Sequence, residues 1–151
     1  MTAKKTPGFT LLEALVVLAL LAVLLTLAAP GMSGLRQQHQ MQGQAEQLQA
    51  SLMLARSQAV ARQQRVTLCV QGAAQTCATQ GSWAQGWLVF VDSNNSARRD
   101  PAEVIVERQD AMPEGFQLTV TNTVKSYFSY GGEGRSVSLS GAFMAGTWRF
   151  C

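Results

Sequence analysis

The amino-acid sequence predicts an α+β fold in which a long N-terminal helix precedes an antiparallel β domain. Residues 14–29 form an apolar run without a charged side chain, as a helix inserted in a membrane requires. Apolar residues then recur at steps of three and four up to Ala59, as on one face of a helix. After Gln64 the pattern changes to short runs of β-branched and aromatic residues between turn residues, which indicates strands.

The N-terminal segment has the composition of a membrane helix. As a helix, the stretch from Phe9 to Ala29 would extend about 30 Å, which matches the hydrocarbon core of a bilayer. Lys4 and Lys5 precede this stretch, and basic residues favour a cytoplasmic N-terminus. The rest of the chain is therefore expected on the far side of the membrane.

Glu13 is the unusual residue of this segment, because a carboxylate inside a membrane helix costs about 2.5–3.5 kcal/mol. Three interpretations are open. A secretory signal peptide would be removed near Ala28, but Pro30 and Gly31 follow without a typical cleavage site. A plain membrane anchor leaves Glu13 unexplained. The third interpretation gives Glu13 a function, as is usual for an isolated charge within a membrane.

The residues around Glu13 resemble a known processing signal. The stretch from Gly8 to Glu13 reads GFTLLE after two lysines, and it is similar to the class III signal of type IV pilins and pseudopilins. The resemblance implies that prepilin peptidase cuts between Gly8 and Phe9 and methylates the new amine of Phe9. Glu13 then becomes the fifth mature residue. Pro30 becomes the twenty-second, where these proteins commonly have a proline that bends the helix.

The same resemblance implies a topology and a set of partners. It divides the chain into a leader peptide over 1–8, a transmembrane helix over 9–29, an amphipathic continuation over 30–64 and a periplasmic β domain over 65–151. The protein would cross the bacterial inner membrane once and enter a pilus or pseudopilus with other minor and major pilins or pseudopilins. In that assembly Glu13 would pair with the N-terminal amine of a neighbouring subunit.

The periodicity of the sequence places the individual elements. The helix should bend at Pro30 and present one apolar stripe to a sheet. The stripe consists of Met41, Ala45, Leu48, Leu52, Ala55 and Ala59, with Glu46, Arg56 and Arg62 as solvated charges. Strands are expected over residues 66–70, 87–91, 104–107, 116–121, 127–130, 137–139 and 147–150. Trp83, Trp87 and Trp148 are expected in the core or on a sheet face.

The second half of the chain resembles one branch of the same family, the FimT/FimU and GspH proteins. Similar stretches are Arg56 to Val60, Val66 to Cys69, Trp83, Gly86 to Asp92, Phe128 to Arg135 and Gly146 to Cys151. The resemblance implies a type IV pilin-like fold and a FimT/FimU-like minor pilin of the complex that initiates a type IV pilus. The alternative within this class is a GspH-like minor pseudopilin of type II secretion.

The three cysteines, Cys69, Cys77 and Cys151, are expected to serve a disulfide. Their spacing lacks the close pairs typical of a zinc site, and an exported protein lies in an oxidising compartment. The short separation favours a bond between Cys69 and Cys77. Cys151 could pair with either of them, so the connectivity stays open and one thiol stays unpaired.

No catalytic set is recognisable, and we expect a structural protein without a cofactor or a bound metal. His39 is the only histidine and is expected at the surface of the helix. Residues 131–134 lack the Lys-Ser/Thr ending of a phosphate loop and are expected to form a flexible turn. Asp92, Asn94 and Asp100 lack the glutamate that completes a calcium loop.

An alternative of another class is a DNA-binding minor pilin for natural transformation. Some FimT-type pilins bind DNA through a C-terminal G-R-x-R element. Here Gly134 and Arg135 are present, but Val137 replaces the second arginine, which should weaken phosphate binding. Arg135 could equally be a solvated turn charge.

Any DNA site would need a local patch of positive charge. Residues 1–8 hold two of the 12 basic residues and none of the nine acidic ones, so their removal lowers the net charge from +3 to +1. Four further basic residues would strengthen the site if the fold brings them to Arg135. They are Arg98, Arg99, Lys125 and Arg149.

Overall fold

The computed structural model describes residues 10–28 and 31–151. Gly8, Phe9 and Pro30 lie outside the described residues, and with them the expected cleavage site and the expected bend of the helix. The chain divides after Gln40 into two compact units, and each unit is described by itself.

Helix α1 (Leu11–Ala28) contains most of the apolar run. Thr10 caps its first turn, because the Thr10 hydroxyl accepts a hydrogen bond from the backbone N–H of Glu13 at 3.2 Å. The large apolar side chains between Leu11 and Leu24 are 45–80% exposed in the single chain. Among the described residues, none of the helices is at once long enough and apolar enough to cross a membrane.

Helix α2 (Gly31–Arg62) is amphipathic over the part that contacts the β domain. The predicted apolar stripe is buried or half-buried from Met41 onward, and the charged residues Glu46, Arg56 and Arg62 are exposed. Leu48, Ala55 and Ala59 are at most 3% exposed and belong to the core that the helix shares with the sheet. The predicted α+β fold, with a helix packed on an antiparallel sheet, is therefore confirmed.

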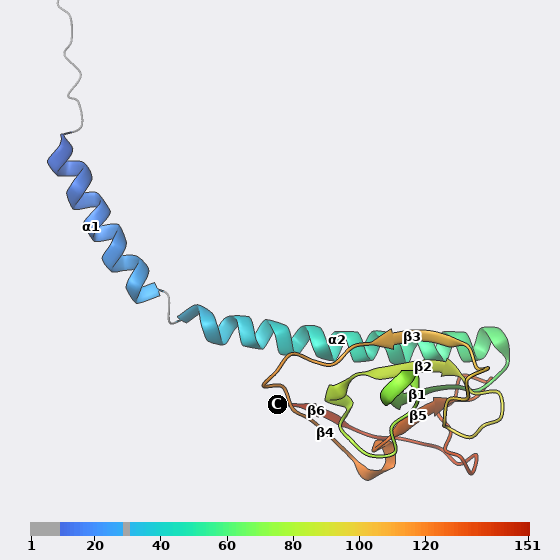
Figure 1. The fold of residues 1–151 in the computed structure, drawn as a ribbon. Coiled ribbons are helices and arrows are strands. Elements are labelled where there is room, and N and C mark those ends of the chain that lie inside the picture. Colours follow the sequence, from blue (N-terminus) through green and yellow to red (C-terminus); the bar gives the residue numbers. More distant parts are fainter. Residues whose placement is uncertain (1–9, 29–30) are drawn as a thin grey trace, which may run out of the picture. The chain divides into compact units, whose positions relative to one another are not determined.

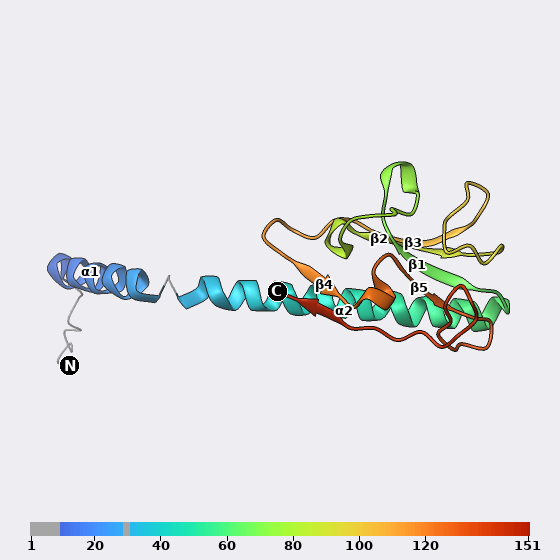
Figure 2. The ribbon, with the colours of Figure 1, turned by 90° about the horizontal axis from the view of Figure 1, so that it is seen from below.

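The described β half forms two antiparallel sheets, and α2 lies along one face of the larger one (Figures 1 and 2). The larger sheet has the strand order β3-β2-β1-β5, and the smaller pairs β4 with β6. The strands are β1 (Val66–Val70), β2 (Trp87–Val91), β3 (Ile105–Gln109), β4 (Leu118–Val120), β5 (Tyr127–Tyr130) and β6 (Trp148–Phe150). The short 3₁₀ helices between them are η1 (Ala73–Gln75), η2 (Trp83–Gln85) and η3 (Asn122–Val124).

Tryptophans form much of the core between helix and sheets. Trp87 is fully buried, and its indole N–H donates to the Ser51 hydroxyl of α2 at 3.0 Å. Trp83 is also fully buried and donates to the carbonyl of Val124 at 2.9 Å. Trp148 is half-buried and meets the Trp83 ring edge to face at 5.8 Å. These partners satisfy the buried indole N–H groups of Trp83 and Trp87, so these large side chains can fill the core without a polar penalty.

The strand predicted over residues 137–139 does not form. Val137 makes only an isolated β-bridge to Phe143, and the chain turns between Ser138 and Gly141. The N–H of Gly141 donates to the carbonyl of Ser138 at 3.0 Å, and Gly141 adopts a φ of +81°. Because a residue without a Cβ tolerates this conformation, the glycine favours a turn where the apolar alternation alone indicated a strand.

Most of the other predicted strands are present, with different bounds at their ends. β1, β2 and β5 have the bounds expected from the sequence. β3 begins one residue later than expected and ends two residues later, and β4 and β6 are shorter than expected.

The disulfide joins Cys69 of β1 to Cys77, whose Cα atoms are 5.5 Å apart. Cys151 is an exposed free thiol. The pairing that the short sequence separation favoured is the one that forms. It holds the segment that contains η1 against the sheet.

Asp92 holds the loop after β2 to the sheet face opposite α2. The side chain is fully buried, and Thr67 donates its hydroxyl hydrogen to one carboxylate oxygen at 2.8 Å. The backbone N–H groups of Ser96 and Ala97 donate to the carboxylate at 2.9 and 3.0 Å. The charge of Asp92 is thus balanced by protein donors. Across the described residues, no three His, Cys, Asp or Glu side chains lie together as ligands for a metal ion.

Candidate functional site

Glu13 lies in the first turn of α1, and its side chain is exposed. The N-terminal end of a helix favours an acidic side chain, because unpaired backbone N–H groups give it a partial positive charge. The neighbouring leucines are exposed as well, Leu11 at 80% and Leu12 at 73%. An exposed carboxylate among apolar side chains is a group with which a cation of another subunit can pair.

The glycine-rich segment of residues 131–135 forms a tight turn at the C-terminal end of α2. The N–H of Gly131 donates to the carbonyl of Arg135 at 2.9 Å, and the N–H of Gly134 donates to the carbonyl of Gly131 at 2.8 Å. Gly132 lies directly against the backbone of Gln63, since a Cβ at this position would come within 2.7 Å of the Gln63 carbonyl carbon. The glycines therefore let the turn approach the helix end, and the turn does not open a helix as a phosphate loop does.

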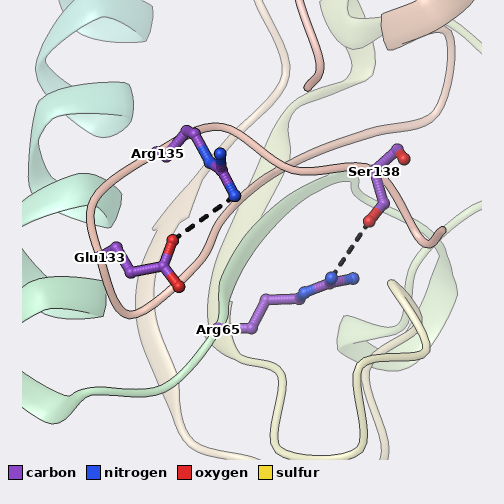
Figure 3. Close-up of polar contacts among 4 residues, drawn as sticks. All are labelled: Arg65, Glu133, Arg135 and Ser138. Carbon is purple, nitrogen blue, oxygen red and sulfur yellow. Dashed lines mark hydrogen bonds and ion pairs between the residues drawn. The ribbon is translucent and has the colours of Figure 1, made fainter. Parts of the chain in front are cut away.

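Arg135 stands on this turn with 63% of its side chain exposed. Its guanidinium lies 3.7 Å from the carboxylate of Glu133, which is 77% exposed (Figure 3). An ion pair this open to water contributes little free energy. Arg135 can therefore leave Glu133 for a stronger anionic partner.

Arg65 lies near this turn but does not converge with Arg135. Figure 3 shows its guanidinium reaching away from Arg135 to the carbonyl of Ser138, to which it donates at 3.1 Å. A hollow of about 430 Å³ is lined by both arginines, but Asp92 and Glu133 line it as well. This hollow is a poor site for an anion, because two carboxylates line it and Arg65 already donates to Ser138.

A second hollow brings Arg135 together with Arg56 of α2. It has a volume of about 320 Å³, and it is lined by Arg56, Tyr130, Glu133, Gly134, Arg135, Ser136 and Phe143. The Arg56 side chain reaches Gly134, since its Nε lies 3.5 Å from the position of a Cβ on that glycine. We call this hollow the Arg56–Arg135 pocket.

The side chains around this pocket are both charged and aromatic. Tyr130 is half-buried, and burial raises the pKa of its hydroxyl above the ordinary value, which the nearby Arg56 guanidinium partly offsets. Phe143 is 73% exposed. The pocket therefore combines two guanidinium groups with an open aromatic ring.

Arg56 and Phe143 were not expected from the sequence to belong to a site. Arg56 was expected to be an ordinary solvated helix charge, and it is exposed as predicted, but the fold also brings it to Arg135. Its place in the stretch that resembles FimT/FimU and GspH proteins was the one available signal. Phe143 follows the turn that replaced a predicted strand, and no pattern around it indicated a site.

The other basic residues proposed for DNA binding lie elsewhere. Arg98 lines a separate hollow of about 170 Å³ with Cys77, and Arg149 of β6 lines one of about 300 Å³ with Thr119. Lys125 follows η3 and is exposed.

Arg99 has a structural role. Its guanidinium donates to the carbonyls of Gln75, Pro101 and Glu103 at 3.1–3.4 Å, and its backbone N–H donates to the sulfur of Cys77. These contacts tie the loop after β2 to the disulfide segment, so Arg99 is not available to a ligand.

A family model matches residues 44–151, which is most of the chain, and its description is type II transport protein GspH. The matched part contains α2 from Gln44 onward, both sheets and the Arg56–Arg135 pocket. The chain belongs to the GspH family. A second model, the prokaryotic N-terminal methylation motif, matches residues 4–29. No curated protein and no solved structure was found to match.

A GspH domain that follows an N-terminal methylation motif along the chain identifies a type IV pilin or pseudopilin of the GspH/FimT type. Membership of these families implies processing by prepilin peptidase, assembly with other pilins and attachment to the membrane as a component of a pilus or pseudopilus. The GspH domain comprises the β half with its disulfide, and the motif contains Glu13 and the whole of α1.

Proposed function

We propose that this chain is a FimT/FimU-like minor pilin that takes part in assembling a type IV pilus, within the complex that initiates the filament. The observation that carries the proposal is the exposed carboxylate of Glu13 on an apolar helix within the N-terminal methylation motif. A subunit of this kind acts by being built into a filament, and it needs no active site of its own.

The proposed assembly begins at the membrane. Residues 9–29 anchor the precursor in the inner membrane, with the N-terminus in the cytoplasm. Cleavage after Gly8 creates an amine on Phe9, and Glu13 of one subunit pairs with the Phe9 amine of its neighbour. The charge that is costly in lipid thereby acquires its partner as the subunit enters the filament.

Packing between helices supplies most of the cohesion of the proposed filament. The large side chains of α1 are 45–80% exposed in the single chain, so neighbouring helices can cover them. The single charge pair fixes the register, because only one offset of two helices brings Glu13 to the amine. The disulfide between Cys69 and Cys77 fits a β domain in the oxidising periplasm.

Removal of the Glu13 carboxylate should separate membrane insertion from assembly. Glu13→Ala should still insert, since the change makes the helix more apolar, but its amount in sheared filaments should fall to a small fraction of wild type. The measurement is immunoblotting of the sheared-filament and membrane fractions from cells that express each variant at equal levels.

Glu46→Ala is the matched control for this experiment. It removes the same charge from an exposed position of α2, where Glu46 accepts a hydrogen bond from Gln42 on the preceding turn. We expect wild-type incorporation from this variant. Wild-type incorporation of Glu13→Ala would contradict the pairing role of the carboxylate.

The alternative within the same class is a minor pseudopilin of type II secretion, which the description of the matched family favours. The two functions differ in what the cell loses when the gene is deleted. Loss of surface pili with normal secretion of exoproteins would support the pilus. Normal piliation with retained exoproteins would instead establish the pseudopilus.

A second candidate function, of another class, is DNA binding for natural transformation. It is favoured by the Arg56–Arg135 pocket, because Arg56 supplies a second guanidinium where Val137 replaces the second arginine of the G-R-x-R element. Two phosphate contacts predict weak, sequence-independent and salt-sensitive binding.

Arg135→Ala should weaken the retention of the full chain on DNA. It should also lower the magnitude of the slope of the logarithm of the binding constant against the logarithm of the salt concentration by about one. Arg108→Ala is the matched control, since Arg108 is also an exposed arginine paired with a nearby carboxylate, that of Asp110 at 3.0 Å. The measurement is retention of detergent-solubilised protein on immobilised DNA across a salt series. Equal effects of the two variants would show that only net charge matters.

A further inference from the structure

Phe143 has an arrangement that the fold does not explain. Its ring is 73% exposed, although the backbone beside it bridges to Val137 and is held in place. It lines the same pocket as Arg56 and Arg135, so a ligand in this pocket would meet an aromatic ring and two guanidinium groups together.

This combination matches the two parts of a nucleotide. Guanidinium groups bind phosphate through paired N–H donors, and an aromatic face stacks on a base of any identity. The stacking requires that the base be unpaired and turned outward. In a duplex both faces of each base are covered by neighbouring pairs, and an exposed ring on the protein surface cannot reach them.

We propose that the Arg56–Arg135 pocket binds a nucleotide of single-stranded DNA, with its base stacked on Phe143 and its phosphate held by Arg56 and Arg135. This inference rests on the second candidate function and adds to it the class of strand that is preferred. Phe143 then contributes the part of the affinity that does not depend on salt.

The acidic residue in the pocket is compatible with this role. Glu133 lies 3.7 Å from Arg135, and both side chains are largely exposed, so water already screens their attraction. A phosphate that contacts both Arg56 and Arg135 has two cationic partners where Glu133 has one. The phosphate therefore replaces Glu133 as the partner of Arg135, and Glu133 turns to solvent.

The test compares two strand types and four variants of the full chain in detergent micelles, one of which is the Arg135→Ala variant described above. A fluorescein-labelled oligothymidylate and a labelled duplex of equal length are titrated at low salt, and fluorescence anisotropy gives the affinities. Phe143→Ala removes the ring and Phe143→Tyr retains it. Leu139→Ala is the matched control, since Leu139 is 52% exposed on the neighbouring turn and does not line the pocket.

We expect the wild-type chain to bind the single strand more tightly than the duplex. Phe143→Ala should weaken single-strand binding by about fivefold to a hundredfold, which corresponds to the loss of one stacked base. Its duplex affinity should not change, and Phe143→Tyr and Leu139→Ala should bind the single strand like wild type.

Three results would overturn the proposal, each in a different way. If Arg135→Ala weakens binding but Phe143→Ala does not, DNA binding stands and the stacking role is wrong. If the wild-type chain binds neither strand type, the candidate function fails together with the inference. Loss of Phe143→Ala from sheared filaments, with unchanged DNA affinity, would assign the ring to a contact with another pilin and would also overturn the proposal.

Discussion

The Gly8→Val variant should keep its leader peptide and fail to enter the filament. Prepilin peptidase, by the family resemblance, requires a small residue beside the bond that it cuts, and the branched side chain of valine would block that position. Without the cut no amine forms on Phe9, so Glu13 of the neighbouring subunit has no partner and its charge stays uncompensated. The loss of cleavage and the loss of incorporation into the filament should both be close to complete.

Intact mass of the membrane-extracted protein measures this outcome directly. The wild-type chain should start at N-methylated Phe9, whereas Gly8→Val should retain residues 1–8. Gly8→Ala is the control, since alanine is also small and should be processed. A mature mass for Gly8→Val would contradict the cleavage site. A wild-type chain that starts near Pro30 would instead favour an ordinary signal peptide.

Gly86→Ala should be among the most destabilising single-methyl changes in the β domain. Gly86 precedes β2 with a φ of +97°, a conformation that a residue with a Cβ adopts only at a cost. An added Cβ would also lie 2.9 Å from the carbonyl carbon of Asp110 and closer still to the carbonyl oxygen of Gln109. These are backbone atoms, and Gln109 is paired with Trp87 in the sheet, so they cannot move aside easily. We expect a loss of about 2–4 kcal/mol in the free energy of unfolding.

Gly115→Ala tests the cost of the positive φ without the steric contact of the added Cβ. Gly115 has a similar φ of +92°, but nothing lies within 4 Å of a Cβ placed there. This variant should therefore lose only about 1 kcal/mol in the free energy of unfolding, which is the cost of the backbone conformation alone. Urea unfolding followed by tryptophan fluorescence should show a larger fall in the midpoint for Gly86→Ala than for Gly115→Ala, at an unchanged slope. Equal falls in the midpoint for the two variants would mean that Gly86 does not lie tightly against the end of β3.

The assembly function and the candidate DNA function depend on different parts of the chain. Glu13 lies in α1, and the Arg56–Arg135 pocket lies beside the last turns of α2, with Arg56 on the exposed side of that helix. Substitutions in one part should leave the other function intact.

Local sequence determined the features that depend on neighbouring residues. The processing motif is contiguous, and the apolar stripe of α2 follows from the helical period of its own residues. Strands β1, β2 and β5 could be placed to the residue, because each is a continuous β-prone run bounded by polar or turn residues. The choice of Cys77 as the partner of Cys69 was favoured by proximity along the chain, and the turn between them made it possible.

Only the tertiary structure decided which distant residues meet. Arg56 and Arg135 share a pocket because the sheet pairs β5 with β1 and the turn after β5 lies against the end of α2. The same packing left Arg98, Lys125 and Arg149 outside this pocket and committed Arg99 to loop carbonyls. The strand predicted over residues 137–139 gave way to a turn between Ser138 and Gly141, because Gly141 and the backbone hydrogen bonds around it favoured a reversal of the chain. Periodicity reports which face of an element is apolar, whereas contacts between elements depend on strand order and register, which no local pattern encodes.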